Sequence, residues 1–288
     1  MQKKDIEKIL NDLNIEVSTI TPASNSFNSN VYIIESYNKK YVFKINTSKK
    51  KTDVESKYIT YLNQYLFTPK VLATGLFEDN SYIIMTYLKG QSILDEEANS
   101  LSKNQLKNIG RLLGTLHNLP LIDVENDSWI NYLDSALEKT QDVLRNVFEK
   151  DNDIIYNYLK NYITNNLKGK YKNSILHMDF RIGNLIIDNN RIGLIDMESM
   201  KNGEYAFDFV KLYRVLSDSN FNVLLSGYKE KGKIDKNFMS KLNFYTLYDS
   251  YTSLWWSASR NKTDSDFYKM NYAIVKKYLG VLNEKGYI

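Results

Sequence analysis

The sequence predicts an α+β protein with a β-rich N-terminal lobe and a mostly helical C-terminal lobe. Alternating, β-branched and aromatic residues predict strands at residues 31–35, 40–45, 71–77 and 81–88. A helix over residues 52–66 interrupts them, and its apolar face is formed by Val54, Tyr58, Ile59 and Leu62. Beyond Gly90 the apolar spacing is that of helices. We therefore predict a β-rich N-terminal lobe over residues 1–88 and a helical C-terminal lobe over residues 89–288.

Short connections separate the elements of the N-terminal lobe. An amphipathic helix comes first, with an apolar face of Ile6, Ile9, Leu10 and Leu13. Residues 36–39 and 78–80 are rich in Ser, Asn and Asp, which favour tight turns between antiparallel strands. The single helix between the second and third strands is the one regulatory-type helix of this lobe.

The C-terminal lobe is a series of helices with one β interruption. Apolar residues at helical spacing predict helices over residues 101–119, 129–149, 152–167, 205–217, 221–231, 236–260 and 266–285. Between them, residues 184–188 and 191–196 are two short strands joined by Asn189 and Asn190. We expect them to form a tight hairpin.

Composition excludes several classes of function. There are no cysteines, which excludes disulfides, thiolate nucleophiles and zinc–thiolate sites. The net charge is only +4, and the one dense basic run, Lys49 to Lys51, is typical of a solvated loop rather than a nucleic-acid surface. No apolar run approaches the roughly 18 residues that span a bilayer. We expect a cytoplasmic monomer or homodimer that binds neither nucleic acid nor membrane.

The hairpin and the loop before it carry the strongest functional pattern. Asp179 lies on the loop, Asn184 five residues later, and Asp196 at the end of the second strand. Phosphoryl transfer needs a positioned hydroxyl, an acceptor for its proton, and metal to neutralise the phosphate charge. Asp179 can hold and deprotonate the hydroxyl. Asn184 and Asp196, brought together by the hairpin, can offer the oxygen ligands that Mg²⁺ prefers.

This pattern resembles the aminoglycoside phosphotransferase and choline kinase superfamily of small-molecule kinases. The family form is His-Gly-Asp-Phe-x-x-x-Asn followed by Ile-Asp-Trp/Phe-Glu, whereas Met178 and Met197 stand here at the Gly and aromatic positions. The resemblance is strongest over residues 175–210. It implies a bilobal protein-kinase-like fold and transfer of the γ-phosphoryl of Mg²⁺-ATP or Mg²⁺-GTP to a small-molecule hydroxyl.

The resemblance also implies roles for residues of the N-terminal lobe. Lys44 matches the strand lysine that contacts the α- and β-phosphates, and Glu55 its ion-pair partner. The loop from Ala23 to Asn30 stands where a phosphate loop is expected, ending in Asn30. Further residues that the family pattern implies are the nucleotide-binding hinge Thr86, Tyr87 and Leu88, the structural His177, His117 and Asp208, and Glu198, which we place outside the first metal shell.

The acceptor stays open at this point. A polycationic aminoglycoside would need carboxylates, which are available at Asp123, Glu125, Asp127, Asp134, Glu138 and Asp142. Choline, ethanolamine or another amino alcohol would favour an aromatic cage, for which the sequence offers Tyr245, Tyr248, Tyr251, Trp255 and Trp256. Only about ten residues separate Asp196 from the next predicted helix, too few for a peptide-docking segment. A catalytically silent nucleotide-binding pseudokinase is the alternative to an enzyme.

Overall fold

The computed structural model describes residues 2–23, 30–37, 39–46, 48–122 and 128–284. The chain forms two compact units. The first consists of Met1–Leu116, His177–Lys201 and Val215–Lys231; the second consists of His117–Leu176, Asn202–Arg214 and Gly232–Ile288. The segment from His177 to Lys201, which carries the catalytic pattern, belongs to the first unit together with the whole N-terminal sheet. The predicted lobe boundary after residue 88 stays a prediction.

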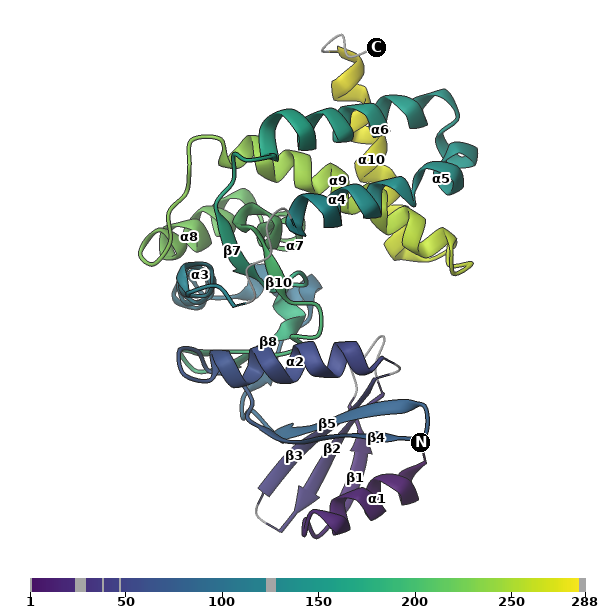
Figure 1. Ribbon diagram of the computed structural model, residues 1–288. Helices are drawn as coiled ribbons and strands as arrows, with labels where there is room; N and C mark the ends of the chain where they lie inside the picture. The colour runs from purple at the N-terminus through teal and green to yellow at the C-terminus, as the bar shows by residue number, and fades with distance from the viewer. Residues whose placement is uncertain (1, 24–29, 38, 47, 123–127, 285–288) are drawn as a thin grey trace. The chain divides into compact units, whose positions relative to one another are not determined.

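An antiparallel sheet of five strands dominates the first unit (Figure 1), in the order β1-β2-β3-β5-β4. Its strands are β1 (Thr19–Pro22), β2 (Asn30–Ser36), β3 (Lys39–Asn46), β4 (Val71–Phe77) and β5 (Asn80–Thr86). The four strands predicted from the sequence are present. The sequence did not predict β1, because it is only four residues long, contains Pro22 and buries only Ile20.

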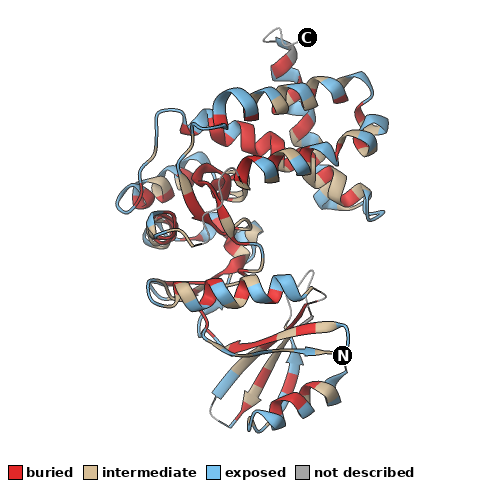
Figure 2. Ribbon diagram, in the orientation of Figure 1, coloured by how far each residue is buried: buried red, intermediate tan, exposed pale blue. Residues whose placement is uncertain are grey.

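Helix α1 (Lys3–Asp12) packs on one face of this sheet, as its amphipathic spacing predicts. Its buried residues Ile6, Ile9 and Leu10 join a core with residues of four strands, namely Ile20, Ile34, Phe43, Ile45 and Ile84. Figure 2 shows buried and half-buried residues along these strands, and the last four residues of β3 are all buried. Leu13, predicted on the same face, follows the helix end and is 40% exposed.

Helix α2 (Lys49–Leu62) begins three residues earlier than predicted and ends four residues earlier. Lys49 to Lys51 therefore form its first turn rather than a solvated loop, which corrects the expectation from the sequence. Buried hydrogen bonds fix this end of the helix to the sheet: Asn46 Nδ2 donates to Thr52 Oγ1 (3.0 Å), and Thr52 Oγ1 lies 2.8 Å from Ser81 Oγ. Glu55, one turn further, is thereby held over strand β3.

A second, three-stranded sheet of the first unit carries the predicted hairpin. Strand β8 (Leu185–Asp188) pairs antiparallel with β9 (Arg191–Leu194), as predicted, and β6 (Gln91–Ser92) adds a third strand. Strand β6 has only two residues, too few for a periodic pattern. Gly90 precedes it with φ 146°, and a side chain there would collide with Ile187 of β8.

The second unit is mostly helical. Its helices are α4 (Ser128–Glu138), α5 (Gln141–Phe148), α6 (Lys150–Tyr162), α9 (Phe238–Ala258) and α10 (Asp266–Glu284). The single helix predicted over residues 129–149 is wrong, because the chain turns at Thr140, whose hydroxyl donates to Leu137 O (2.6 Å). Strands β7 (Asn173–Leu176) and β10 (Lys201–Glu204), which the sequence did not predict, form a two-stranded sheet.

Three of the five aromatic residues of α9 that could form a ligand cage belong to the core, whereas Trp255 and Trp256 are half-buried. Tyr245, Tyr248 and Tyr251 are almost fully buried. Their hydroxyls bond within the unit: Tyr248 donates to Leu133 O (2.8 Å), Tyr251 donates to Asn152 Oδ1 (2.6 Å), and Tyr245 accepts from Trp129 Nε1 (3.1 Å). These three tyrosines are therefore unavailable to a cationic ligand. Among the described residues, no helix is long and apolar enough to cross a membrane.

Two helices of the first unit, α3 (Lys103–Asn118) and α8 (Asp218–Lys229), meet through glycines. A side chain at Gly110 of α3 would overlap the Leu224 carbonyl and lie 2.7 Å from Tyr228 N.

Gly110→Ala should therefore force the backbones apart and lower the stability by about 1–3 kcal/mol. Gly280→Ala is the matched control, since a Cβ atom there would meet no described atom within 4 Å beyond its own turn of the helix. It should be neutral or stabilising by up to about 1 kcal/mol. Thermal unfolding measures both; equal melting temperatures would contradict the close approach.

Candidate active site

The loop after β7 is braced from inside the first unit. His177 is fully buried, and its Nε2 donates to the Ile195 carbonyl (2.9 Å) just before Asp196. Met178 follows with φ 70°, a left-handed conformation that glycine adopts at less cost. The family pattern has Gly at this position, so the backbone conformation gives a physical reason for that preference.

Asp179 is held by Asn184. The side-chain Nδ2 of Asn184 donates to both the Asp179 carbonyl (2.9 Å) and the Asp179 Oδ2 (3.0 Å). Two oxygen acceptors fix the orientation of the amide, so its nitrogen points to Asp179 and its Oδ1 points elsewhere. Asn184 itself is buried. One side chain thus positions the carboxylate of Asp179 and still has an oxygen to offer a cation.

The hairpin brings Asp196 next to this pair. The Ile195 backbone N–H donates to the Asn184 carbonyl (3.1 Å), so the residue before Asp196 is bonded directly to Asn184. Asp196 has φ 65°, and its side chain is 38% exposed. Strand β9 ends at Leu194, two residues earlier than predicted. Asp179, Asn184 and Asp196 therefore lie together, as the spacing in the sequence indicated.

Lys44 is a buried cation among three carboxylates. From strand β3, its Nζ lies 2.9 Å from Glu55, 2.6 Å from Asp196 and 3.0 Å from Glu198. Burial alone would lower the pKa of Lys44, but the three carboxylates outweigh burial and raise it above its ordinary value. Burial raises the pKa of the Glu55 carboxyl, against the opposing charge of Lys44. The predicted Lys44–Glu55 ion pair is present.

Glu198 takes a position that sequence reasoning missed. Its carboxylate bridges Lys44 and Lys51, the latter on the first turn of α2. The side chain of Glu198 is only 11% exposed, whereas that of Lys51 is 47% exposed. The Ile-Asp-x-Glu pattern marked Glu198 as noteworthy, but no local signal pairs it with a lysine 147 residues away.

Arg181 and Asp95 are two further residues that the sequence did not single out. Arg181 Nη1 donates to Asp95 Oδ2 (2.9 Å), and its Nε lies 3.6 Å from Asp179 Oδ2. Burial would lower the pKa of Arg181, but Asp179, Asp95 and Asp196 together raise it. A permanent positive charge therefore lies beside the carboxylate of Asp179.

The predicted nucleotide-binding backbone lies at the end of β5. The Thr86 N–H donates to Lys70 O (2.9 Å) and the Tyr87 N–H to Lys40 O (3.3 Å), so both donors are used within the sheet. The Leu88 N–H makes no backbone hydrogen bond to any described residue. Asn30 begins β2 opposite Ile45. Its side chain and the preceding loop, residues 24–29, lie outside the described residues.

The donors present fit a magnesium ion that is shared with a nucleotide. Among the described residues, no three His, Asp or Glu side chains form a group that could hold a metal. One carboxylate, Asp196, and one amide oxygen, Asn184 Oδ1, are a small ligand set. Mg²⁺ is commonly bound by one or two carboxylates together with substrate phosphates. The site therefore suits a metal that arrives with its phosphates.

Comparison with known proteins decides the family. Residues 19–237, which make up most of the chain, match the sequence profile of the phosphotransferase enzyme family. The chain belongs to the phosphotransferase enzyme family. A probable ketoamine kinase of Staphylococcus aureus is 25% identical over 260 residues, covering 81% of this chain and 85% of that protein. The chain is thus a kinase of the aminoglycoside phosphotransferase group, as the sequence predicted.

Solved structures of aminoglycoside phosphotransferases share the fold. The GDP and kanamycin complex of APH(2″)-IIIa superimposes with a TM-score of 0.77 at 13% identity, covering 96% of this chain and 98% of that one. A thermostable mutant of APH(4)-Ia gives 0.76 at 16% identity, with the same coverage. ADP-bound APH(2″)-Ib gives 0.69 at 20% identity, covering 96% and 97%. These likenesses confirm the predicted kinase-like fold.

The carboxylates expected near an acceptor are partly engaged. Asp134 and Glu138 of α4 both face Lys160 of α6, at 3.0 and 3.7 Å. Asp142 lies in the first turn of α5. Asp123, Glu125 and Asp127 lie outside the described residues.

His117 and Asp208 form a buried pair (3.2 Å) within the second unit of this phosphotransferase, in keeping with the structural roles expected of them.

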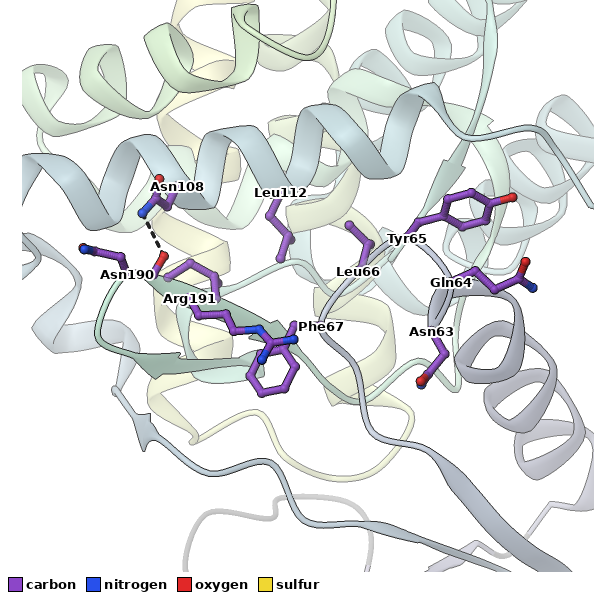
Figure 3. A pocket seen from close by; sticks show the side chains of 10 residues that line it. Asn63, Gln64, Tyr65, Leu66, Phe67, Asn108, Leu112, Asn190 and Arg191 are labelled. Atoms are coloured by element: carbon purple, nitrogen blue, oxygen red, sulfur yellow. Dashed lines mark hydrogen bonds between the residues drawn. The ribbon is translucent and has the colours of Figure 1, made fainter.

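A polar crevice of about 480 Å³ lies elsewhere in the first unit (Figure 3). Arg191 stacks on the Phe67 ring (3.7 Å to the ring centroid), and Asn108 Nδ2 donates to Asn190 O (2.9 Å). None of the predicted site residues lines it. The crevice is therefore separate from the Lys44 and Asp179 cluster.

Replacing Lys44 tests the electrostatics of this cluster. Lys44→Gln leaves Glu55 buried beside Asp196 and Glu198 without their shared cation, which should cost about 3–5 kcal/mol of stability. Without Lys44, the pKa of the buried Glu55 carboxyl should rise further above its unfolded value, because burial is no longer opposed by the lysine charge. The folded variant then binds more protons than its unfolded chain, so its deficit should be small near pH 4.5 and grow as the pH rises.

Melting temperatures at pH 5 and pH 8 in EDTA, each compared with the wild type, measure this dependence. Lys49→Gln removes a lysine whose partner Asp53 is exposed and serves as the matched control. It should change little at either pH. A Lys44→Gln deficit that shrinks towards pH 8 would contradict the assignment.

Proposed function

We propose that this chain transfers the γ-phosphoryl group of a Mg²⁺-bound nucleoside triphosphate to a hydroxyl of a small acceptor. The observation that carries the proposal is the Asn184 side chain, which holds Asp179 through Nδ2 and keeps Oδ1 for a cation beside Asp196. A hydroxyl-orienting carboxylate and a metal-binding pair are then fixed to each other. We place the nucleotide in residues 1–88 and the acceptor in residues 89–288.

Asp179 acts on the acceptor. Its carboxylate accepts the hydroxyl hydrogen bond, orients the oxygen towards the γ-phosphorus and takes the proton as the new P–O bond forms. The bond between the γ-phosphorus and the bridging oxygen breaks, and that oxygen leaves with the nucleoside diphosphate. Arg181, 3.6 Å away, favours the ionised form of Asp179 before the transfer.

Lys44, Asn184 and Asp196 act on the nucleotide. Lys44, fixed by Glu55, binds the α- and β-phosphates. Asn184 and Asp196 would hold Mg²⁺, which would neutralise charge on the phosphate oxygens. Glu55 and Glu198 give Lys44 two partners besides Asp196.

The hinge residues Thr86, Tyr87 and Leu88 bind the base. The Leu88 N–H is the donor that faces the base, because those of Thr86 and Tyr87 bond to Lys70 and Lys40. We assign Asn30, at the start of β2, to the phosphates. Either ATP or GTP can present an edge to this backbone, and the solved relatives include ADP and GDP complexes.

A sugar-derived ketoamine is the acceptor we favour. The probable ketoamine kinase matches along most of the chain, whereas the aminoglycoside enzymes match by fold at 20% identity or less. A polycation would need several unengaged carboxylates, and Asp134 and Glu138 both face Lys160. A ketoamine with one amine needs fewer carboxylates. Choline is less favoured, because Tyr245, Tyr248 and Tyr251 are buried and Arg260 already lies over the ring of Trp256.

An acceptor panel tests this assignment. Release of ADP or GDP is measured with 1-amino-1-deoxyfructose, fructose, kanamycin and choline, and ³¹P NMR of the product identifies the phosphate ester. We expect the ketoamine to exceed fructose by roughly tenfold or more in kcat/KM, because the amine adds a specific contact. Preferred turnover of kanamycin would overturn the acceptor class. Nucleotide binding without transfer to any compound would support a pseudokinase instead.

Asp179→Asn tests the proposed base. The amide keeps the shape but accepts no proton, so kcat should fall by roughly 10²–10⁴-fold while the Kd for Mg²⁺-nucleotide stays nearly unchanged. Asp188→Asn, an isosteric change on β8 of the same hairpin, should leave kcat intact. Equal losses of turnover and nucleotide affinity in Asp179→Asn would refute its role as base.

Asp196→Ala tests the metal-binding pair. Loss of its carboxylate should raise the Mg²⁺ concentration needed for nucleotide binding, because a ligand is removed from a small set. Isothermal titration of nucleotide at several Mg²⁺ concentrations measures the change. An unaltered Mg²⁺ dependence would exclude Asp196 as a ligand.

A further inference from the structure

Arg181, Gly183 and Asp95 form a compact cluster behind Asp179. Asp95, in the 3₁₀ helix η1 (Asp95–Ser100), uses one carboxylate oxygen for Arg181 Nη1 (2.9 Å) and the other for the Gly183 N–H (3.0 Å). Both groups belong to the four-residue stretch that separates Asp179 from Asn184. A single carboxylate from a distant part of the sequence therefore fixes the middle of the catalytic loop.

Gly183 makes room for the guanidinium. A Cβ atom at Gly183 would overlap Arg181 Nη1 and lie 3.2 Å from Arg181 Cζ. No positive φ requires glycine here, so the reason for its small size is the arginine that lies over it. The Arg181 side chain is only 27% exposed, and its guanidinium lies between Asp95 and Asp179.

The charges around Arg181 define what it can do. Asp179, Asp95 and Asp196 all act on it, so it lies in the field of the proposed base and of the proposed metal ligand. A guanidinium presents its N–H donors in a fixed planar fork, so it sets the direction of each contact in a way that a lysine ammonium, a point charge, does not. Removing it would take away the charged contact to Asp179 Oδ2 and leave the hydrogen bond from Asn184 Nδ2.

We propose that Arg181 is a positioning residue for the transfer step and that Asp95 acts through it, as a clamp on Asp179. The proposal rests on the proposed function, because it assigns a role relative to Asp179 as the base. Arg181 holds the Asp179 carboxylate in the direction of the acceptor hydroxyl. Asp95 holds Arg181, and Gly183 leaves the space in which it lies.

Steady-state kinetics of Arg181→Gln and Arg181→Lys test the clamp. Misplacement of the base should lower kcat roughly ten- to hundredfold in Arg181→Gln, with the nucleotide KM and melting temperature nearly unchanged. Arg181→Lys should recover only part of kcat, and added guanidinium should raise kcat of a truncated Arg181→Ala variant. Arg111→Gln, which breaks an exposed ion pair with Glu230, is the matched control and should keep full kcat.

Asp95→Asn and Gly183→Ala test whether the neighbours act through Arg181. Each should lower kcat in the wild-type background, since one weakens the anchor and the other displaces the guanidinium. Neither should lower it further when combined with Arg181→Gln, because the clamp is already absent. Additive losses in the double variants would overturn the clamp.

The outcomes separate this proposal from the one on which it rests. If Asp179→Asn is inactive while Arg181→Gln keeps wild-type kcat, the clamp fails and the kinase assignment stands. If Arg181→Gln loses kcat and nucleotide affinity together, Arg181 is a nucleotide ligand and the clamp is overturned. A wild-type protein that transfers no phosphoryl group overturns both.

Discussion

Lys44 places a full positive charge inside the first unit, and the surrounding structure has to compensate for it. Glu55 from α2, and Asp196 and Glu198 from the segment after β9, supply three carboxylates within 3.0 Å of one ammonium. A buried charge without partners would cost several kcal/mol. Because Lys44 and its partners come from three places in the sequence, the ion cluster forms only when β3, α2 and the hairpin are correctly placed. The cluster also carries more negative than positive charge at Lys44, which suits the arrival of a cation.

The catalytic loop is likewise fixed by a small number of hydrogen bonds. Asn184 positions Asp179, His177 supports the carbonyl before Asp196, and the Ile195 N–H joins the two strands of the site. Each contact ties a residue with proposed chemistry to the backbone of its neighbour. The proposed base and metal ligands are therefore fixed by short-range pairing, while Lys44 and Arg181 connect them to distant parts of the first unit.

This difference explains what the sequence could predict. Asp179, Asn184 and Asp196 lie within 18 residues and are joined by a hairpin, so spacing and strand pattern were enough. Glu55 followed from the family resemblance, which pairs the strand lysine with a glutamate of the next helix. Glu198 with Lys51 and Arg181 with Asp95 were missed, because those pairs are 147 and 86 residues apart. Strands β1 and β6 were too short for periodicity, and the break at Thr140 depends on a local hydroxyl bond that leaves apolar spacing intact.

A structure of the chain with Mg²⁺ and a non-hydrolysable ATP or GTP analogue tests the account most directly. It predicts that the Asp196 carboxylate leaves Lys44 and binds the metal together with Asn184 Oδ1, while Lys44 stays paired with Glu55 and contacts the α- and β-phosphates. Asp179 should keep its hydrogen bond from Asn184 and lie free of the metal. A nucleotide bound away from Lys44, or a metal held without Asp196, would contradict the central claim.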